Sequence, residues 1–235
     1  MSKKPTILLL PPGGFDCSYF EYYLKGDINA LRKYSVICIN LPSRKKLSKK
    51  PMRDDGRYIA NYINQSTQKF IVIGTSTSAA SLLESLPLIE NNKISSVCII
   101  FGGEIIPRKW KSVAKMALFL LNSNPISRSL FSTYLKMKSE PYKRDKSIQF
   151  KRLLQFYTKA IDWNIPSKKI YTPALIIHAL NDDIVDGQSI AKLESIFPNS
   201  KILKPNILHE PTDSTAKKIF DILLSEESYL QGKIV

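Results

Sequence analysis

The chain has 235 residues, of which 43% are hydrophobic and 23% are charged. This composition is that of an ordinary globular protein and excludes a disordered tail, a collagen and a coiled coil. Its length predicts one domain, or two at most. There is no run of about 18 apolar residues, so no transmembrane helix is expected. The apolar stretch near the N-terminus is too short for a signal-peptide core, and we expect a cytoplasmic protein.

The net charge of +15 is unevenly distributed. From 105 to 172 there are 15 basic and 3 acidic residues, which account for +12 of that charge. A solvated basic surface explains this without any partner. The alternative is an anionic partner: an acidic protein, a phosphorylated ligand, nucleic acid or an anionic membrane. Nucleic acid is the least expected, because no recognised binding motif accompanies the charge.

The three cysteines form no close pair in sequence, and neither a disulfide framework nor a cysteine-rich metal motif is expected. Cys38 and Cys98 lie in apolar runs and are predicted to be buried core residues. Cys17 follows a glycine-rich turn and is predicted to be a bystander.

Six short apolar runs predict buried strands. In chain order they span 6–10, 35–40, 69–74, 95–101, 172–179 and, more weakly, 201–203. They are almost continuously hydrophobic, which is typical of parallel strands covered on both faces. Helical patterns lie between them, at 54–65, 76–86, 187–197 and 212–224. The alternation predicts an α/β fold with a mostly parallel central sheet flanked by helices.

The segment from 107 to 166 interrupts this alternation. It has no strong strand signal but three helical patterns, at 110–121, 125–137 and 147–163. We predict a helical cap at 107–166, inserted into a core made of residues 1–106 and 167–235. Most of the basic excess falls within this insertion.

A candidate nucleophile lies in Gly74-Thr75-Ser76-Thr77-Ser78, between an apolar strand and a helix of small residues. A serine at such a bend stands at the carboxyl edge of the sheet, and the helix N-terminus behind it favours developing negative charge. The sequence meets the G-x-S-x-G pattern except for its last glycine, which is Ser78. A strand followed by a serine-rich helix cap would give the same letters without catalysis.

The serine needs a base, and the chain contains only two histidines. His209 lies in a polar loop from which its ring can reach an exposed serine, so it is the preferred base. His178 ends a strand and is predicted to be structural. An orienting carboxylate is also required. Asp182 is the preferred candidate and Asp183 the second, and a turn or helix cap is the alternative role for either.

With a strand-end serine, a strand-end aspartate and a loop histidine in that order, the sequence resembles the α/β-hydrolase superfamily over essentially its whole length. The resemblance implies a catalytic triad of Ser76, Asp182 and His209, with the predicted cap inserted before the acid-bearing strand. It also implies an oxyanion hole formed by the backbone N–H groups of Gly13 and Thr77. No metal or organic cofactor is expected.

Three positions depart from the superfamily pattern. Two prolines at 11–12 replace the usual His-Gly, and because proline has no backbone N–H, Gly13 is the first possible donor in that loop. Leu208 replaces the usual glycine before the histidine, and Ser78 replaces the last glycine of the serine motif. None of these changes removes a catalytic group, but they leave the subfamily open.

Residues 11–20 and 40–44 resemble the start of type II thioesterases, which act on acyl chains bound to acyl carrier proteins. Carrier proteins are acidic, so this resemblance implies that basic cap residues bind the carrier. Apolar cap residues are expected to pack on the core or to line an acyl-chain pocket. The residues assigned to substrate or partner binding are Gly14, Phe15, Arg108, Lys109, Lys111 and Lys115.

The favoured function is hydrolysis of a carboxylic ester or thioester of an acyl chain through an acyl-enzyme. One alternative keeps the fold but makes the protein a lyase or an acyltransferase. The other is a basic, non-catalytic module that binds a membrane or a protein, with the pattern at 110–121 as an amphipathic interfacial helix.

Overall fold

The computed structural model describes residues 6–12, 15–20, 34–104, 111–138, 150–180, 182, 185, 187–207, 209 and 213–231. Within these residues, six parallel strands form one sheet in the order β2-β1-β3-β4-β5-β6. Every predicted strand is confirmed, with ends that differ by at most two residues. The strands are β1 (Thr6–Leu10), β2 (Ser35–Cys38), β3 (Phe70–Thr75), β4 (Ile94–Ile100), β5 (Ala174–Ile177) and β6 (Ser200–Leu203).

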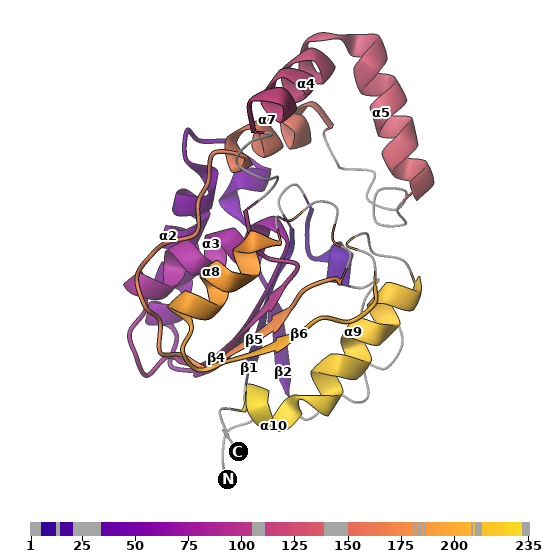
Figure 1. Cartoon of the computed structure of the whole chain (residues 1–235). Coiled ribbons are helices and arrows are strands. Elements are labelled where there is room, and N and C mark those ends of the chain that lie inside the picture. The colour runs from indigo at the N-terminus through magenta and orange to yellow at the C-terminus, as the bar shows by residue number, and fades with distance from the viewer. Residues whose placement is uncertain are drawn as a thin grey trace.

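Helices cover both faces of the sheet (Figure 1). On one face lie α2 (Pro51–Gln65), α3 (Thr77–Ser85) and α8 (Gln188–Ile196), and on the other lies α9 (Asp213–Ser225), followed by α10 (Glu227–Leu230). Two short 3-10 helices, η2 (Pro42–Arg44) and η3 (Leu86–Leu88), complete the connections. This covering confirms the predicted fold and explains why the strands read as unbroken apolar runs.

The central strand β3 shows how the two halves of the core are divided. Val72 packs with the side chains of α2, α3 and α8, whereas Ile71 and Ile73 pack on the opposite face with those of α9. Successive side chains of a strand point to opposite faces, so one strand contributes to both halves.

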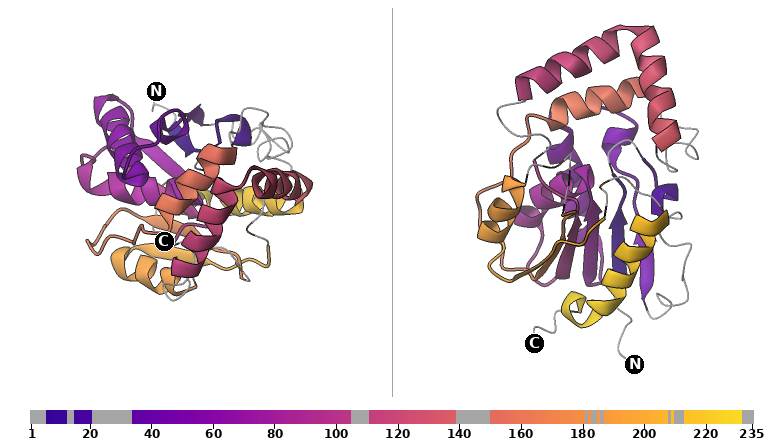
Figure 2. Two further views of the ribbon diagram at one scale, coloured as in Figure 1. Left: turned by 90° about the horizontal axis from the view of Figure 1, so that it is seen from above. Right: turned by 45° about the vertical axis from the view of Figure 1, so that its right-hand side comes forward.

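The segment between β4 and β5 contains α4 (Lys111–Ser123), α5 (Pro125–Lys138) and α7 (Phe150–Ala160), which we call the helical insert. It lies beyond the carboxyl ends of the strands, with α7 between α4 and the sheet (Figures 1 and 2). Leu153, Leu154 and Phe156 of α7 are buried, whereas α4 has no buried residue. That residues 107–166 act as a cap stays a prediction.

A disulfide joins Cys17 to Cys38, contrary to the prediction that no disulfide forms. It arises because β1 and β2 are parallel neighbours, with Leu9 opposite Cys38, so the chain leaving β1 passes the end of β2. Cys38 is therefore half-buried rather than a core residue, whereas Cys98 is free and buried as predicted. That the protein is cytoplasmic stays a prediction.

Candidate active site

Ser76 occupies the sharp turn between β3 and α3, with φ 54° and ψ −121°. A positive φ is uncommon outside glycine and marks a bend held in place by its surroundings. The Ser76 N–H donates to the carbonyl of Ile100 at the end of β4, at 2.8 Å. Gly74 lets the strand and helix approach, because a Cβ there would lie only 3.0 Å from Cα of Ala79. The bend therefore presents Ser76 at the carboxyl edge of the sheet.

Ser78, which stands in place of the last motif glycine, is fully buried, and its hydroxyl contacts both the bend and the end of β1. Its Oγ accepts from the N–H of Thr75 at 2.8 Å. The same Oγ lies 2.6 Å from the carbonyl oxygen of Leu10 and 2.9 Å from that of Thr75. The departure from glycine thus ties the bend to the end of β1.

The structure brings Ser76, His209 and Asp182 together. Nε2 of His209 lies 3.4 Å from Oγ of Ser76, and Nδ1 lies 2.8 and 3.0 Å from the two carboxylate oxygens of Asp182. The Asp182 side chain is fully buried, and the N–H of Val185 donates to it at 2.9 Å. This arrangement can pass a proton from the hydroxyl to the imidazole, whose positive charge the carboxylate would stabilise.

The turn after β4 supports this geometry, and the sequence analysis did not single it out. The ring of Phe101 lies 5.0 Å from that of His209, and Phe101 has a φ of 52°. A Cβ on Gly103 would lie 2.4 Å from Cγ1 of Val185, so only glycine leaves room for Val185 at this position. An aromatic residue followed by two glycines at a strand end was the available sequence signal.

His178, the other histidine, is buried behind the carboxylate. Its Nδ1 lies 3.9 Å from Oδ2 of Asp182 and has no hydrogen-bond partner among the described residues. Burial lowers the pKa of His178 despite the opposing charge of Asp182. His209 makes the shorter contact with Asp182, and a structural role for His178 stays a prediction.

The loop after β1 was predicted to supply an oxyanion donor and substrate contacts. Gly13 and Gly14 lie outside the described residues, while Phe15 is buried and its N–H donates to the carbonyl of Pro12 at 3.0 Å. Thr77, the other predicted donor, is the buried first residue of α3.

The same loop is fastened to the end of β2 by polar contacts as well as by the disulfide. Arg44 forms a 2.7 Å ion pair with Asp16, and the N–H of Cys17 donates to Asn40 at 3.1 Å. Burial alone would raise the pKa of Asp16, but hydrogen bonds from Ser18 and Arg44 hold it below its usual value. These contacts and the disulfide together tie residues 16–17 to residues 38–44.

The basic residues assigned to partner binding are only partly described, because Arg108 and Lys109 lie outside the described residues. Nζ of Lys111 donates to Asn164 at 3.3 Å, and Lys115 forms a 2.5 Å ion pair with Asp162. Both lysines therefore join α4 to the segment that follows α7.

Glu104, which the sequence analysis missed, anchors the helical insert to the core. Its carboxylate accepts from Lys192 of α8 at 2.8 Å and from the N–H of Ile165 at 3.2 Å. Its own N–H bonds to Ser189 at 2.8 Å. Burial would raise the pKa of Glu104, but the bonds from Lys192 and Ile165 hold it below its usual value.

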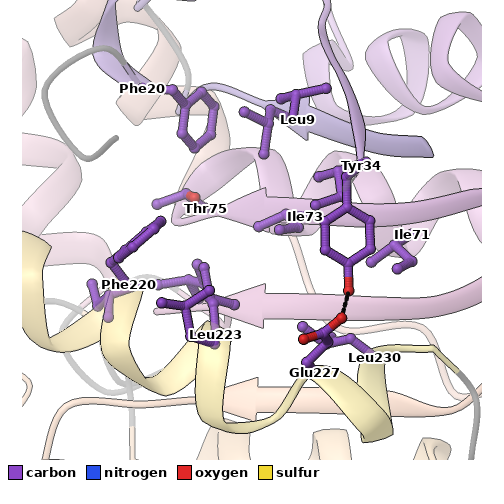
Figure 3. A pocket seen from close by; sticks show the side chains of 15 residues that line it. Leu9, Phe20, Tyr34, Ile71, Ile73, Thr75, Phe220, Leu223, Glu227 and Leu230 are labelled. Carbon is purple, nitrogen blue, oxygen red and sulfur yellow. Dashed lines mark hydrogen bonds between the residues drawn. The ribbon is translucent and has the colours of Figure 1, made fainter. Parts of the chain in front are cut away.

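An apolar pocket lies between the sheet and α9 (Figure 3). Thr75 lines it, directly before Ser76, and Thr75 Oγ1 has no hydrogen-bond partner among the described residues. At the other end Tyr34 donates to Glu227 at 2.8 Å. The pocket thus offers apolar surface that begins beside the candidate nucleophile. Its apolar lining includes Leu9, Phe20, Ile71, Ile73, Phe220 and Leu223.

Six parallel strands with a serine turn after β3, an acid after β5 and a histidine after β6 define an α/β-hydrolase fold. No family model matches the chain, and no curated protein matches it in sequence.

Solved structures do match it. An esterase (EaEST) from Exiguobacterium antarcticum has a TM-score of 0.76 and 13% identity, over 97% of this chain and 92% of that one. A hydrolase from Oleispira antarctica has a TM-score of 0.72 and 13% identity, over 95% and 92%. The type II thioesterase YbtT of the Yersiniabactin NRPS/PKS biosynthetic pathway has a TM-score of 0.67 and 14% identity, over 97% of this chain and 95% of that one. These likenesses show the α/β-hydrolase fold that the sequence predicted.

Proposed function

We propose that this protein is a serine hydrolase that cleaves a carboxylic ester or thioester of an acyl chain. The supporting observation is the line of contacts from Ser76 through His209 to the buried Asp182. Ser76 Oγ attacks the carbonyl carbon while His209 Nε2 takes its proton, and Asp182 holds the imidazole and stabilises its cation. The 3.4 Å serine–histidine distance is long for a hydrogen bond, but such contacts often tighten when substrate binds.

The tetrahedral oxyanion requires donors. In this proposal the N–H of Thr77, at the start of α3, is one and that of Gly13 is the other, each worth about 3 kcal/mol of barrier. His209 then activates a water molecule that releases the acyl group from Ser76. Esterases and thioesterases among the neighbours in fold support a reaction of this class.

The apolar pocket supports an acyl substrate in particular. Its lining is apolar over the length of β3 from Ile71 to Ile73, and it begins at Thr75. We expect Leu223→Trp, which fills the pocket from α9, to reduce kcat/KM for long-chain esters while acetyl esters are turned over as before. Equal losses for both chain lengths would remove the pocket from the proposal.

The central test is labelling with a fluorophosphonate, followed by mass spectrometry to locate the adduct. We expect wild type to be labelled at Ser76, and Ser76→Ala to lose both the label and ester hydrolysis. Ser112→Ala, on the exposed surface of α4, is the matched control and should behave as wild type. A folded wild-type protein that is neither labelled nor active on a panel of esters and acyl thioesters would overturn the proposal.

A narrower version has the acyl chain delivered on an acyl carrier protein. The basic excess in 105–172 supports it, as do type II thioesterases among the neighbours in fold. Lys111 and Lys115 would exchange their exposed contacts with Asn164 and Asp162 for carboxylates of the carrier, which costs little because exposed ion pairs contribute little. The test compares kcat/KM for one acyl chain on a carrier protein and on a small thiol. Equal values would remove the carrier from the proposal.

A further inference from the structure

The outward face of the helical insert is apolar. In α4, Val113, Met116 and Leu120 recur at helical spacing and are 59, 62 and 57% exposed, and the neighbouring Phe119 is 64% exposed. In α5, Ile126 and Leu130 are 72 and 68% exposed. Figures 1 and 2 show both helices outermost, with α7 between α4 and the sheet.

The charged side chains of α4 do not lie on this face, and its exposed polar residues are the small Ser112 and Ser123. Lys111 and Lys115 are less exposed than the apolar side chains of this face. They bond to Asn164 and Asp162, which follow α7. A surface helix ordinarily turns its apolar stripe to the core and its charges to water. Single exposed apolar side chains are common, but a group on two adjacent helices indicates a surface that is covered in use.

The charge of the chain selects the kind of partner. A second copy would bring +15 against +15, and most of that charge lies in the stretch that contains these helices. An acidic protein would need cations on the contact face, and the described exposed side chains of α4 are apolar or small and polar. An anionic lipid surface does not need cations on the contact face itself, since its interior accepts the apolar side chains. Its surface potential extends over about a Debye length and attracts the basic residues of the surrounding stretch.

We propose that the outer face of α4 and α5 lies against an anionic lipid bilayer, with Met116, Phe119, Leu120 and Leu130 below the headgroups. None of the described helices is both long and apolar enough to cross a bilayer. Because the insert lies beyond the carboxyl edge of the sheet, this contact brings the Ser76 side of the molecule toward the lipid (Figure 1). The proposal does not depend on Ser76 being a nucleophile.

The test is co-sedimentation of the full chain with phosphatidylcholine vesicles, with and without phosphatidylglycerol. We expect binding to the anionic vesicles at low salt, weakened as salt rises, and little binding to the neutral ones. Leu120→Glu should reduce the vesicle affinity by about tenfold, and Leu120→Glu/Leu130→Glu should reduce it further.

Leu88→Glu is the matched control, because Leu88 is 51% exposed on η3 and the substitution makes the same change of charge. It should bind as wild type, and so should Ser76→Ala, which separates this proposal from the hydrolase. Three results would overturn the lipid contact. They are no binding by folded wild type, equal losses in Leu120→Glu and Leu88→Glu, or a dimer or carrier-protein complex that Leu120→Glu disrupts without any vesicle binding.

Discussion

The carboxyl edge of the sheet and the helical insert beyond it are held together in different ways. At the edge, Asp182 and Ser78 are fully buried and have bonds to neighbouring segments, and Phe101 is almost fully buried. In the insert, α4 has no buried residue and is held by Lys111 and Lys115 at its first turns. The edge is fixed by buried, directional contacts, while α4 packs on its neighbouring helices through half-buried side chains and exposed polar contacts.

This difference predicts which substitutions should alter stability and activity and which should not. A buried, bonded group costs much free energy to remove, whereas an exposed ion pair contributes little. Substitutions at the edge should therefore alter chemistry and stability, and those on α4 should alter mainly what the protein contacts.

The largest expected effect tests the carboxyl edge of the sheet. Asp182→Asn should lower kcat for ester hydrolysis by about 10⁴-fold, because an amide cannot hold the imidazole in the productive tautomer. Asp162→Asn, which makes the same chemical change in the exposed pair with Lys115, should leave kcat within about twofold. Similar losses in both variants would contradict the assignment of the acid.

The next prediction compares two leucines within the insert. Leu154→Ala in α7 should reduce the free energy of unfolding by about 2–5 kcal/mol, because Leu154 is fully buried and its truncation leaves a cavity. Leu120→Ala in α4 should change it by about 0.5 kcal/mol or less. Urea unfolding measures both values. A large loss in Leu120→Ala would show that the outer face of α4 is covered within the chain.

The disulfide is expected to stabilise the edge at the loop after β1. Cys17 and Cys38 are separated by 21 positions, and opening a loop of that length should reduce the free energy of unfolding by about 3 kcal/mol. Urea unfolding with and without dithiothreitol measures this. Cys17→Ala/Cys38→Ala should match the reduced wild type and no longer respond to the reductant. The stability of Cys98→Ala should still fall when dithiothreitol is added. If it does not fall, the effect of the reductant depends on Cys98 rather than on the disulfide.

The smallest effect concerns a buried carboxyl near this edge, Asp55 of α2. It accepts from the N–H and hydroxyl of Ser43, at 2.9 and 2.6 Å, yet burial raises its pKa to about 6. Its pKa in the unfolded chain is about 3.9. The folded state therefore binds the proton more tightly, so stability is greatest below about pH 4 and falls as pH rises through 6, by about 2–3 kcal/mol in total.

Asp55→Asn can still accept from the Ser43 N–H and can donate to its hydroxyl, so it should lack this decrease. The measurement is urea unfolding of both proteins from about pH 4 to about pH 7.5. The difference between wild type and variant isolates this one group, since both carry the remaining charges. Parallel pH profiles would contradict the raised pKa of Asp55.

The sequence predicted the sheet, and placed the candidate site at one edge of it, for identifiable reasons. The four inner strands, β1, β3, β4 and β5, are short runs that are buried on both faces, so their apolar pattern is nearly uninterrupted. The edge strands β2 and β6 are only partly buried. The candidate triad could be selected because the chain has only two histidines and because the order of Ser76, Asp182 and His209 is specific to one fold. Their proximity follows from that fold, since all three follow the carboxyl ends of parallel strands.

What the sequence could not predict depends on contacts between distant segments. The Cys17–Cys38 pair requires that β1 and β2 be neighbours, and strand order is not visible in local composition. The roles of Phe101 and Glu104 depend on what packs beside them. For α4, helical spacing revealed an apolar stripe, but periodicity does not state which side of a helix meets the core.

Ser78 gives the bend at Ser76 a property that glycine could not supply. A hydroxyl has one proton, and two carbonyl oxygens lie within its reach, that of Leu10 at the end of β1 and that of Thr75 beside Ser76. The two acceptors share this proton, so a shift that favours one lengthens the bond to the other. The end of β1 and the turn at Ser76 therefore compete for a single hydrogen atom.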